Sequence, residues 1–209
     1  MTGSLTLYTN PMSRGRIARW MMEESRQPYE VVNVPFGPSM KAADYRAINP
    51  MGKVPALKHG DRIITECAAI CAYMAETFPE TGLAPRPEER ADYYRWMFFA
   101  AGPLEQAVTN RAMGFVVPDQ NQRMSGYGSY EQVMDTLEKA VSAYDFIAGN
   151  RFTAADVYVG SAVAWGLMFG SIEKRPAFED YARRIGSREA YRRTHALCEQ
   201  EGEAMKAAG

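Results

Sequence analysis

Residues 49–65 of the chain read NPMGKVPALKHGDRIIT. Within this stretch, the segments 54–59 and 62–65 flank Gly60-Asp61, a residue pair typical of the two-residue turn of a β-hairpin. The pattern therefore predicts two antiparallel strands joined by a tight turn.

The sequence before this hairpin has the pattern of a strand, a helix and a second strand. Residues 4–9, SLTLYT, alternate as in a half-buried strand, and Asn10-Pro11 ends the alternation. Residues 29–34, YEVVNV, repeat the strand pattern, so a βαβ unit with parallel strands is predicted. A short polar helix is expected at 40–47. The apolar residues of the helix between the strands share one face: Ile17, Trp20 and Met21.

The residues after the hairpin predict an amphipathic helix. Thr65 can cap its N-terminus, and the apolar positions that follow recur at helical spacing. The first part of the chain therefore predicts the element order βαβαββα. The apolar positions of this helix are Cys67, Ile70, Cys71, Met74 and Phe78.

A change of pattern then divides the chain. Residues 79–88, PETGLAPRPE, hold three prolines and a glycine and cannot continue a helix. We therefore expect a linker at 80–87 between an α/β domain at 1–79 and an all-helical domain at 88–209.

The helical domain carries further local signals. Gly102-Pro103 predicts a kink in a helix that covers 88–117. Thr153-Ala-Ala-Asp156 is a capping box, which predicts the start of another helix. A separate amphipathic helix is indicated by Val133, Leu137, Val141 and Tyr144.

The composition fits a globular protein without a strong electrostatic preference. The 209 residues are 46% hydrophobic and 23% charged, which is enough apolar material to bury a core. Lys and Arg number 24 against 25 Asp and Glu, so the net charge of −1 favours neither nucleic acid nor an anionic membrane as a partner. The N-terminus lacks the pattern of a signal peptide, and no run of about 18 apolar residues occurs. We therefore expect a cytoplasmic protein.

The cysteines and histidines favour neither a disulfide framework nor a metal site. Cys67, Cys71 and Cys198 are too few for the framework of a secreted protein and form no C-x-x-C pair. His59 and His195 are the only histidines, so a closed zinc site lacks ligands and no metal is expected.

Four motifs in the expected order resemble the glutathione S-transferase family. Residues 49–57, NPMGKVPAL, look like the N-P-x-G-x-V-P-x-L segment of that family, and residues 65–70, TECAAI, look like its E-S-x-x-I segment. Residues 152–156, FTAAD, are similar to its second-domain capping motif, and residues 7–13, LYTNPMS, to a serine-type active-site loop. The resemblance implies a thioredoxin-like N-terminal domain, an all-helical C-terminal domain, glutathione as cosubstrate, and a homodimer active in detoxification.

The resemblance assigns the glutathione backbone to the segments around Pro55 and Glu66. In a thioredoxin-like domain the Val54-Pro55 peptide is expected to be cis, with the Val54 main chain free to pair with a bound peptide. Without that context, Pro55 would only shape the start of a strand. The helix that begins at Glu66 offers amides to the γ-glutamyl carboxylate, and the Glu66 carboxylate can meet the ligand's ammonium group. An acidic first-turn residue otherwise stabilises its own helix.

Three more residues complete the predicted glutathione site. Cys67 stands where serine is usual in the family, so a weak thiol donor replaces a hydroxyl. The backbone amide stays, so this change allows weaker glutathione binding but does not require its loss. Lys41 and Lys53 are candidates for the glycine carboxylate of glutathione, against the alternative that both are ordinary solvated lysines.

The reacting thiol is expected where the first strand meets the first helix. An alkyl thiol with a pKa of about 8.5 becomes thiolate near neutral pH when a hydroxyl donor and a helix N-terminus stabilise the anion. The resemblance points to Ser13 as that donor, with Asn10 and Arg14 as alternatives; Ser13 could equally be the helix N-cap. Tyr8 falls too early, within the strand. Because the segment from Pro11 to Arg14 holds no C-x-x-C, dithiol redox chemistry is not expected.

The leading hypothesis is a glutathione transferase that presents the thiolate to a small electrophile. The alternatives are a non-catalytic binding or interaction module of the same fold and a glutathione-dependent peroxidase or isomerase. The electrophile is expected between the domains, against adaptable apolar side chains. Its candidate lining residues are Met12, Asn110, Met113, Phe115 and Trp165.

Overall fold

The computed structural model describes residues 3–207, which form two compact units. The first unit holds the residues up to Ala84 and those from Ser187 onward, and the second runs from Pro85 to Gly186. A sheet with helices forms the first unit and helices alone form the second, which confirms the predicted fold class. Residues 187–207 were expected with the helical domain and instead pack in the first unit. The predicted domain limits, 1–79 and 88–209, concern segments that fold independently. The division into packed units does not test independent folding, so these limits stay a prediction.

The first unit is built on a four-stranded mixed sheet with the order β2-β1-β3-β4. β1 pairs with β2 in parallel and with β3 in antiparallel orientation, and the predicted hairpin joins β3 to β4 through Gly60 and Asp61. Alternate residues of β1 are buried, as the sequence pattern predicts. The strands are β1 (Leu5–Thr9), β2 (Glu30–Asn33), β3 (Ala56–His59) and β4 (Arg62–Thr65).

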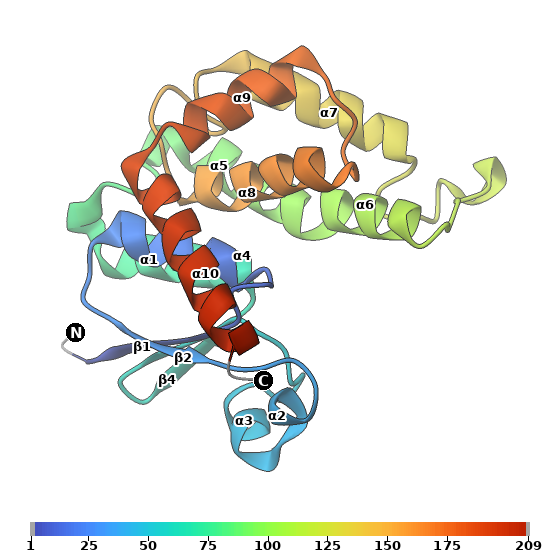
Figure 1. The fold of residues 1–209 in the computed structure, drawn as a ribbon. Coiled ribbons are helices and arrows are strands. Elements are labelled where there is room, and N and C mark those ends of the chain that lie inside the picture. Colours follow the sequence, from blue (N-terminus) through green and yellow to red (C-terminus); the bar gives the residue numbers. More distant parts are fainter. Residues whose placement is uncertain (1–2, 208–209) are drawn as a thin grey trace. The chain divides into compact units, whose positions relative to one another are not determined.

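Two helices, α1 and α4, pack against each other and against one face of this sheet (Figure 1). α1 buries the predicted apolar face, and α4 buries three of its five predicted apolar positions. The C-terminal helix α10 packs across α1. The bounds of these helices are α1 (Gly15–Ser25), α4 (Cys67–Thr77) and α10 (Glu189–Ala207).

A small apolar cluster connects the sheet with the segment between β2 and β3. Val34, Met40 and Tyr45 are buried in it, and Tyr8 packs against them with its ring centroid 6.1 Å from that of Tyr45. Tyr8 is therefore part of the packing of the sheet, as its strand position predicts. In place of one polar helix at 40–47, this segment forms two short helices, α2 (Pro38–Lys41) and α3 (Ala43–Ile48).

In the second unit, the long predicted helix is interrupted where Gly102-Pro103 predicts a kink. A π-helical segment, Ala100–Leu104, joins α5 to α6 and accommodates Pro103, whose nitrogen cannot donate a helical hydrogen bond. The helix ends at Ala112 and not at residue 117, since Gly114 adopts a positive φ of 75°. The helices are α5 (Arg90–Phe99), α6 (Glu105–Ala112), α7 (Tyr130–Ala143), α8 (Ala154–Phe169) and α9 (Pro176–Gly186).

The capping box at the start of α8 is confirmed and reaches beyond its own helix. Asp156 accepts hydrogen bonds from the main-chain nitrogens of Thr153 (2.9 Å) and Ile147 (2.7 Å), and from the hydroxyl of Tyr181 (2.9 Å). Burial raises the pKa of this carboxyl to about 6, although these hydrogen bonds favour the charged form. Asp156 thus joins the start of α8 to α9 and to the preceding loop.

Candidate functional site

The loop between β1 and α1 is organised by the side chain of Asn10. Its Nδ2 donates to the carbonyl of Val34 (2.9 Å), and its Oδ1 accepts from the main-chain nitrogen of Met12 (2.9 Å). Asn10 is buried, with 2% of its surface exposed. Both functional ends of the amide therefore fix the loop.

Ser13 lies in this loop with its hydroxyl in a defined orientation. The hydroxyl donates to the carbonyl of Asn10 (2.7 Å) and accepts from the main-chain nitrogen of Gly15 (2.9 Å). The side chain is partly exposed. The expectation that Ser13 is the N-cap of α1 is wrong, because Arg14 occupies that position, although Ser13 still satisfies one of the first free amides.

Gly15, the first residue of α1, is required by a close approach. A Cβ atom at this position would lie 2.0 Å from Thr9 Oγ1, 3.0 Å from Ser13 Oγ and 3.2 Å from the nitrogen of Asn10. Any side chain here would displace the loop that carries Ser13.

The start of α4 lies beside the same loop. The thiol of Cys67 donates to the carbonyl of Arg14, with 3.5 Å between sulfur and oxygen, although the two residues are 53 apart in sequence. The exposed Glu66 precedes the helix with φ 68° and ψ 127°, a conformation that residues with a side chain rarely adopt. The expected cap by Thr65 is wrong, because Thr65 ends β4 and Glu66 occupies the N-cap position.

The segment before β3 is held by hydrogen bonds to its own main chain. The carbonyl of Lys53 accepts from the hydroxyl of Tyr45 (2.7 Å) and from Nδ2 of Asn49 (2.8 Å). The ammonium group of Lys41 donates to the carbonyls of Met51 (3.2 Å) and Gly52 (2.9 Å). These contacts fix the chain up to Val54 and leave the Lys53 side chain exposed.

The Val54-Pro55 peptide is cis, as expected for this fold. Within residues 3–207, no hydrogen bond joins the main chain of Val54 to another residue. Pro55 is buried, and Val54 packs against the cluster around Tyr45.

The first unit therefore contains ten of the predicted site residues. Those of the loop after β1 lie close to the N-terminus of α4, as the contact between Cys67 and Arg14 records. The ten residues are Asn10, Met12, Ser13, Arg14, Lys41, Lys53, Val54, Pro55, Glu66 and Cys67.

The four residues expected around the electrophile from the helical part belong to the second unit. Asn110 lies in α6 and donates from Nδ2 to the hydroxyl of Tyr127 (3.0 Å). Met113 and Phe115 follow that helix and are exposed, with 58% and 63% of their surfaces accessible. Trp165 lies in α8, with its ring 5.8 Å from that of Phe169.

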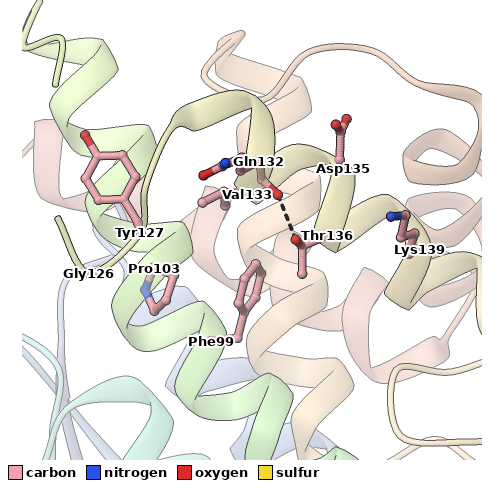
Figure 2. Close-up of a pocket in the computed structure, with 9 residues that line it drawn as sticks. All are labelled: Phe99, Pro103, Gly126, Tyr127, Gln132, Val133, Asp135, Thr136 and Lys139. Carbon is pink, nitrogen blue, oxygen red and sulfur yellow. Dashed lines mark hydrogen bonds between the residues drawn. The ribbon is translucent and has the colours of Figure 1, made fainter. Parts of the chain in front are cut away.

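The second unit also has a cavity of about 480 Å³ (Figure 2). Phe99, Pro103 and Tyr127 supply its apolar and aromatic lining, and polar side chains of α7 complete it. None of the residues predicted to contact the electrophile lines this cavity, but Asn110 is bound to Tyr127. The α7 side chains that line the cavity are Gln132, Val133, Asp135, Thr136 and Lys139.

Two thiols and a histidine of the first unit have shifted pKa values. Burial raises the pKa of the Cys71 and Cys198 thiols, which disfavours the reactive thiolate. Burial lowers the pKa of His195, and the nearby Arg16 lowers it further. Over residues 3–207, no three or more His, Cys, Asp or Glu side chains gather as potential metal ligands. No helix in this described part has the length and apolar character needed to cross a membrane.

Sequence reasoning missed several residues that build the site. Gly15 and Tyr45 carry no local signal of their contacts, because these depend on residues brought near by the fold. Lys41 is among the predicted site residues and Asn49 begins the 49–57 motif, but the hydrogen bonds of their side chains to the main chain of residues 51–53 carry no local signal in the sequence.

Comparisons with known proteins agree with this architecture in both parts of the chain. Residues 7–82 match the family model of the glutathione S-transferase N-terminal domain, and residues 108–189 match that of the C-terminal domain. Glutathione S-transferase A of Pleuronectes platessa is 30% identical over 144 residues, which cover 65% of this chain and 64% of that protein. Glutathione S-transferase GstA of Escherichia coli O157:H7 is 26% identical over 168 residues, or 77% of this chain and 82% of that protein.

Two solved structures with bound glutathione are similar over nearly the whole chain. A glutathione transferase homologue from Sulfitobacter is 26% identical with a TM-score of 0.72, covering 96% of this chain and 99% of that one. The theta class glutathione S-transferase of Xanthomonas axonopodis pv. citri is 25% identical with a TM-score of 0.73, covering 92% and 97%.

Proposed function

The chain belongs to the glutathione S-transferase family, and we propose that it binds glutathione in its first unit and presents the thiol as thiolate to a small electrophile. The observation that carries this proposal is the contact of Cys67 with the carbonyl of Arg14. It brings the N-terminus of α4, which suits a carboxylate, beside the loop that carries a hydroxyl donor. A peptide with a terminal carboxylate and an internal thiol matches both features.

The glutathione backbone is held by main-chain and charged groups. The unpaired main chain of Val54 pairs with the ligand's peptide bonds. The first amides of α4 meet the γ-glutamyl carboxylate, and the Glu66 carboxylate meets the ammonium group. The Cys67 thiol donates to the same γ-glutamyl carboxylate when its hydrogen turns from the Arg14 carbonyl to the ligand. The positive φ of Glu66 supports this role, since strained conformations of this kind concentrate at binding sites. Lys41 and Lys53 serve the glycine carboxylate.

Ser13 is the proposed thiolate donor. The amide of Gly15 already donates to its oxygen, which makes the hydroxyl a better donor through cooperativity. When the hydroxyl rotates from the Asn10 carbonyl to the thiolate, that carbonyl keeps its bond from the Ser13 amide at 3.0 Å. The rotation therefore leaves no main-chain acceptor without a partner.

The two alternatives to Ser13, Asn10 and Arg14, have different proposed roles. Both ends of the Asn10 amide are committed to the loop, so Asn10 acts as a positioning residue. Arg14 supplies positive potential to the same loop. In the reaction, the S–H bond of the thiol breaks and its proton leaves to solvent. The thiolate then forms a carbon–sulfur bond while a leaving group departs from that carbon with the electron pair of the broken bond. Met12, Asn110, Met113 and Trp165 are the proposed contacts of the electrophile.

A second candidate function is a non-catalytic module of this fold. The bond from the Ser13 hydroxyl to Asn10 favours it, because a hydroxyl that stays there cannot stabilise a thiolate. Glutathione titration by calorimetry separates the two: binding without any fall in the pKa of the bound thiol supports the module. A thiol pKa that falls toward neutrality, together with conjugation of a model electrophile, supports the transferase. Peroxidase and isomerase activity would use the same glutathione site and are tested with the corresponding substrates.

The assembly and location follow from family membership. We infer a homodimer in the cytoplasm that acts in detoxification, with no nucleic acid, membrane or metal involved. Sedimentation equilibrium tests this assembly. A homodimer should have twice the 23.4 kDa mass of one chain.

A further inference from the structure

The peptide group between Lys53 and Val54 is bound at one end and unbound at the other. The carbonyl of Lys53 accepts from the hydroxyl of Tyr45 at 2.7 Å and from Nδ2 of Asn49 at 2.8 Å. The nitrogen of the same peptide belongs to Val54, whose main chain forms no hydrogen bond within residues 3–207. This peptide is trans, so its carbonyl and its N–H point in opposite directions. The side chains of Tyr45 and Asn49 therefore set the direction in which the Val54 N–H points.

Both donors are themselves held in place by the fold. Tyr45 is 6% exposed and belongs to the apolar cluster at the sheet. Burial raises the pKa of its hydroxyl to about 12, so the hydroxyl keeps its hydrogen near neutral pH. Asn49 is 3% exposed, and its Oδ1 accepts from the main-chain nitrogen of Met51 at 3.1 Å. That contact fixes the orientation of the Asn49 amide, with Nδ2 toward the Lys53 carbonyl.

Hydrogen bonds accepted by a carbonyl also change the N–H of the same peptide. Each bond draws electron density toward the oxygen, which polarises the peptide and makes its N–H a stronger donor. An amide that is already oriented also loses less conformational freedom when a ligand binds. The Val54 N–H should therefore bind a ligand carbonyl more tightly than an amide whose carbonyl is unbound.

From these contacts we infer that Tyr45 and Asn49 are positioning residues for glutathione, because they hold and polarise the Lys53–Val54 peptide so that the Val54 N–H meets a main-chain carbonyl of the ligand. The inference rests on the proposed function for the identity of the ligand. Both side chains act through this peptide, whereas Ser13 acts on the thiol. Loss of the two donors should therefore weaken glutathione binding and leave the pKa of the bound thiol unchanged.

Three variants test this role. Tyr45→Phe removes one donor and keeps the aromatic ring in the cluster. The double variant Tyr45→Phe with Asn49→Ala removes both donors. Tyr8→Phe is the matched control, because the Tyr8 ring lies 6.1 Å from that of Tyr45 but its hydroxyl does not bind Lys53 in the described part of the chain.

The peptide itself can be observed without a ligand. Lys53-Val54 is the only Lys-Val pair in the sequence. Protein labelled with ¹³C in the lysine carbonyls and ¹⁵N in valine therefore gives a single NMR signal from directly bonded labels, and that signal reports this peptide. Calorimetry then gives the glutathione affinity, and absorbance of the bound thiolate across pH gives the thiol pKa.

The signal of the Lys53–Val54 peptide should shift in Tyr45→Phe, shift further in the double variant and stay in place in Tyr8→Phe. Glutathione affinity should fall about threefold in Tyr45→Phe and about tenfold in the double variant, as hydrogen bonds that hold the peptide are lost. The pKa of the bound thiol should be that of the parent in all three variants.

An unchanged peptide signal in the double variant overturns the inference, since the two side chains would then not hold the peptide. A shifted signal with the affinity of the parent overturns the positioning role. An equal loss of affinity in Tyr8→Phe, or a raised thiol pKa in the double variant, also overturns it, because the effect would then not act through this peptide. If the parent binds no glutathione, the proposed function fails and the positioning role fails with it, while the peptide signal still decides whether Tyr45 and Asn49 hold the Lys53 carbonyl.

Discussion

The hydroxyl of Ser13 donates its hydrogen to the main-chain carbonyl of Asn10 over 2.7 Å. The same carbonyl also accepts from the amide of Ser13, so the loop turns back on itself at this point. The hydroxyl is thereby held at a fixed place at the start of α1, where the helix dipole also favours an anion. To act as the proposed thiolate donor, the hydroxyl would turn its hydrogen away from this carbonyl.

Gly15→Ala should destabilise the first unit, because its Cβ would overlap Thr9 Oγ1. Overpacking of this kind costs about 1–3 kcal/mol in free energy of unfolding. Urea unfolding measures this loss. The double variant Thr9→Ala with Gly15→Ala removes the overlapping oxygen and should recover part of the stability. Equal stability of Gly15→Ala and the parent would contradict the close approach.

Glu201→Gln should weaken the attachment of α10 to α1. It removes the partner at 3.0 Å and leaves the buried Arg19 guanidinium only the longer pair with Glu23 at 3.9 Å, so the cost should approach the value of about 3 kcal/mol for breaking a buried pair. The matched control is Asp180→Asn, which breaks the exposed pair with Arg183 and should cost less than about 1 kcal/mol. Thermal unfolding of both variants measures the loss of stability in each. A similar loss in both would contradict a stabilising role of the buried pair between Arg19 and Glu201.

Stability should depend on pH through Asp156. Its folded-state pKa, about 6, is above the ordinary value of 3.8, so the protonated carboxyl favours the folded state. This contribution is fully present below about pH 4 and is lost as the pH rises through 6. It corresponds to no more than about 3 kcal/mol. Asp156→Asn removes the titration.

The measurement is the free energy of unfolding of parent and Asp156→Asn at pH 4 and pH 7. The parent should lose stability relative to the variant between these values. A difference that stays constant would show that the Asp156 carboxyl does not titrate in this range in the folded protein.

Cys67→Ser should strengthen glutathione binding. A hydroxyl is a better hydrogen-bond donor than a thiol, and one such bond contributes about 1 kcal/mol, or roughly fivefold in affinity. Cys67→Ala serves as the control that removes the donor altogether and should bind no more tightly than the parent. Calorimetric titration of the three proteins checks the order; a serine variant that binds more weakly than the parent would place Cys67 away from the carboxylate.

Local sequence patterns predict most of the elements of this fold. The alternation at 4–9, the Gly60-Asp61 turn and the break at Gly102-Pro103 each act over a few residues, and each is confirmed. The helix ends are less well predicted, since both Ser13 and Thr65 lie one residue before the actual N-cap. Several kinds of residue can occupy the N-cap position, and the geometry of the turn before the helix determines which one does.

Contacts between distant segments could not be predicted from one sequence. The pairing of Arg19 with Glu201, and of Glu24 with Arg188, joins residues more than 160 apart and places α10 on α1. The contact between Cys67 and Arg14 likewise joins residues that are distant in sequence, 53 positions apart. Periodicity identifies a helix and its apolar face, but the partner of that face is chosen by packing of the whole unit.

The most direct test of the proposed function is the pKa of glutathione bound to the parent protein and to Ser13→Ala. Calorimetry establishes binding, and thiolate absorbance across pH gives the pKa. We expect the parent to bind glutathione with a thiol pKa well below the free value of about 8.5, and Ser13→Ala to raise it toward that value with a rate loss of about a hundredfold. An unperturbed pKa in the parent, or the same lowered pKa in both proteins, would contradict the role assigned to Ser13.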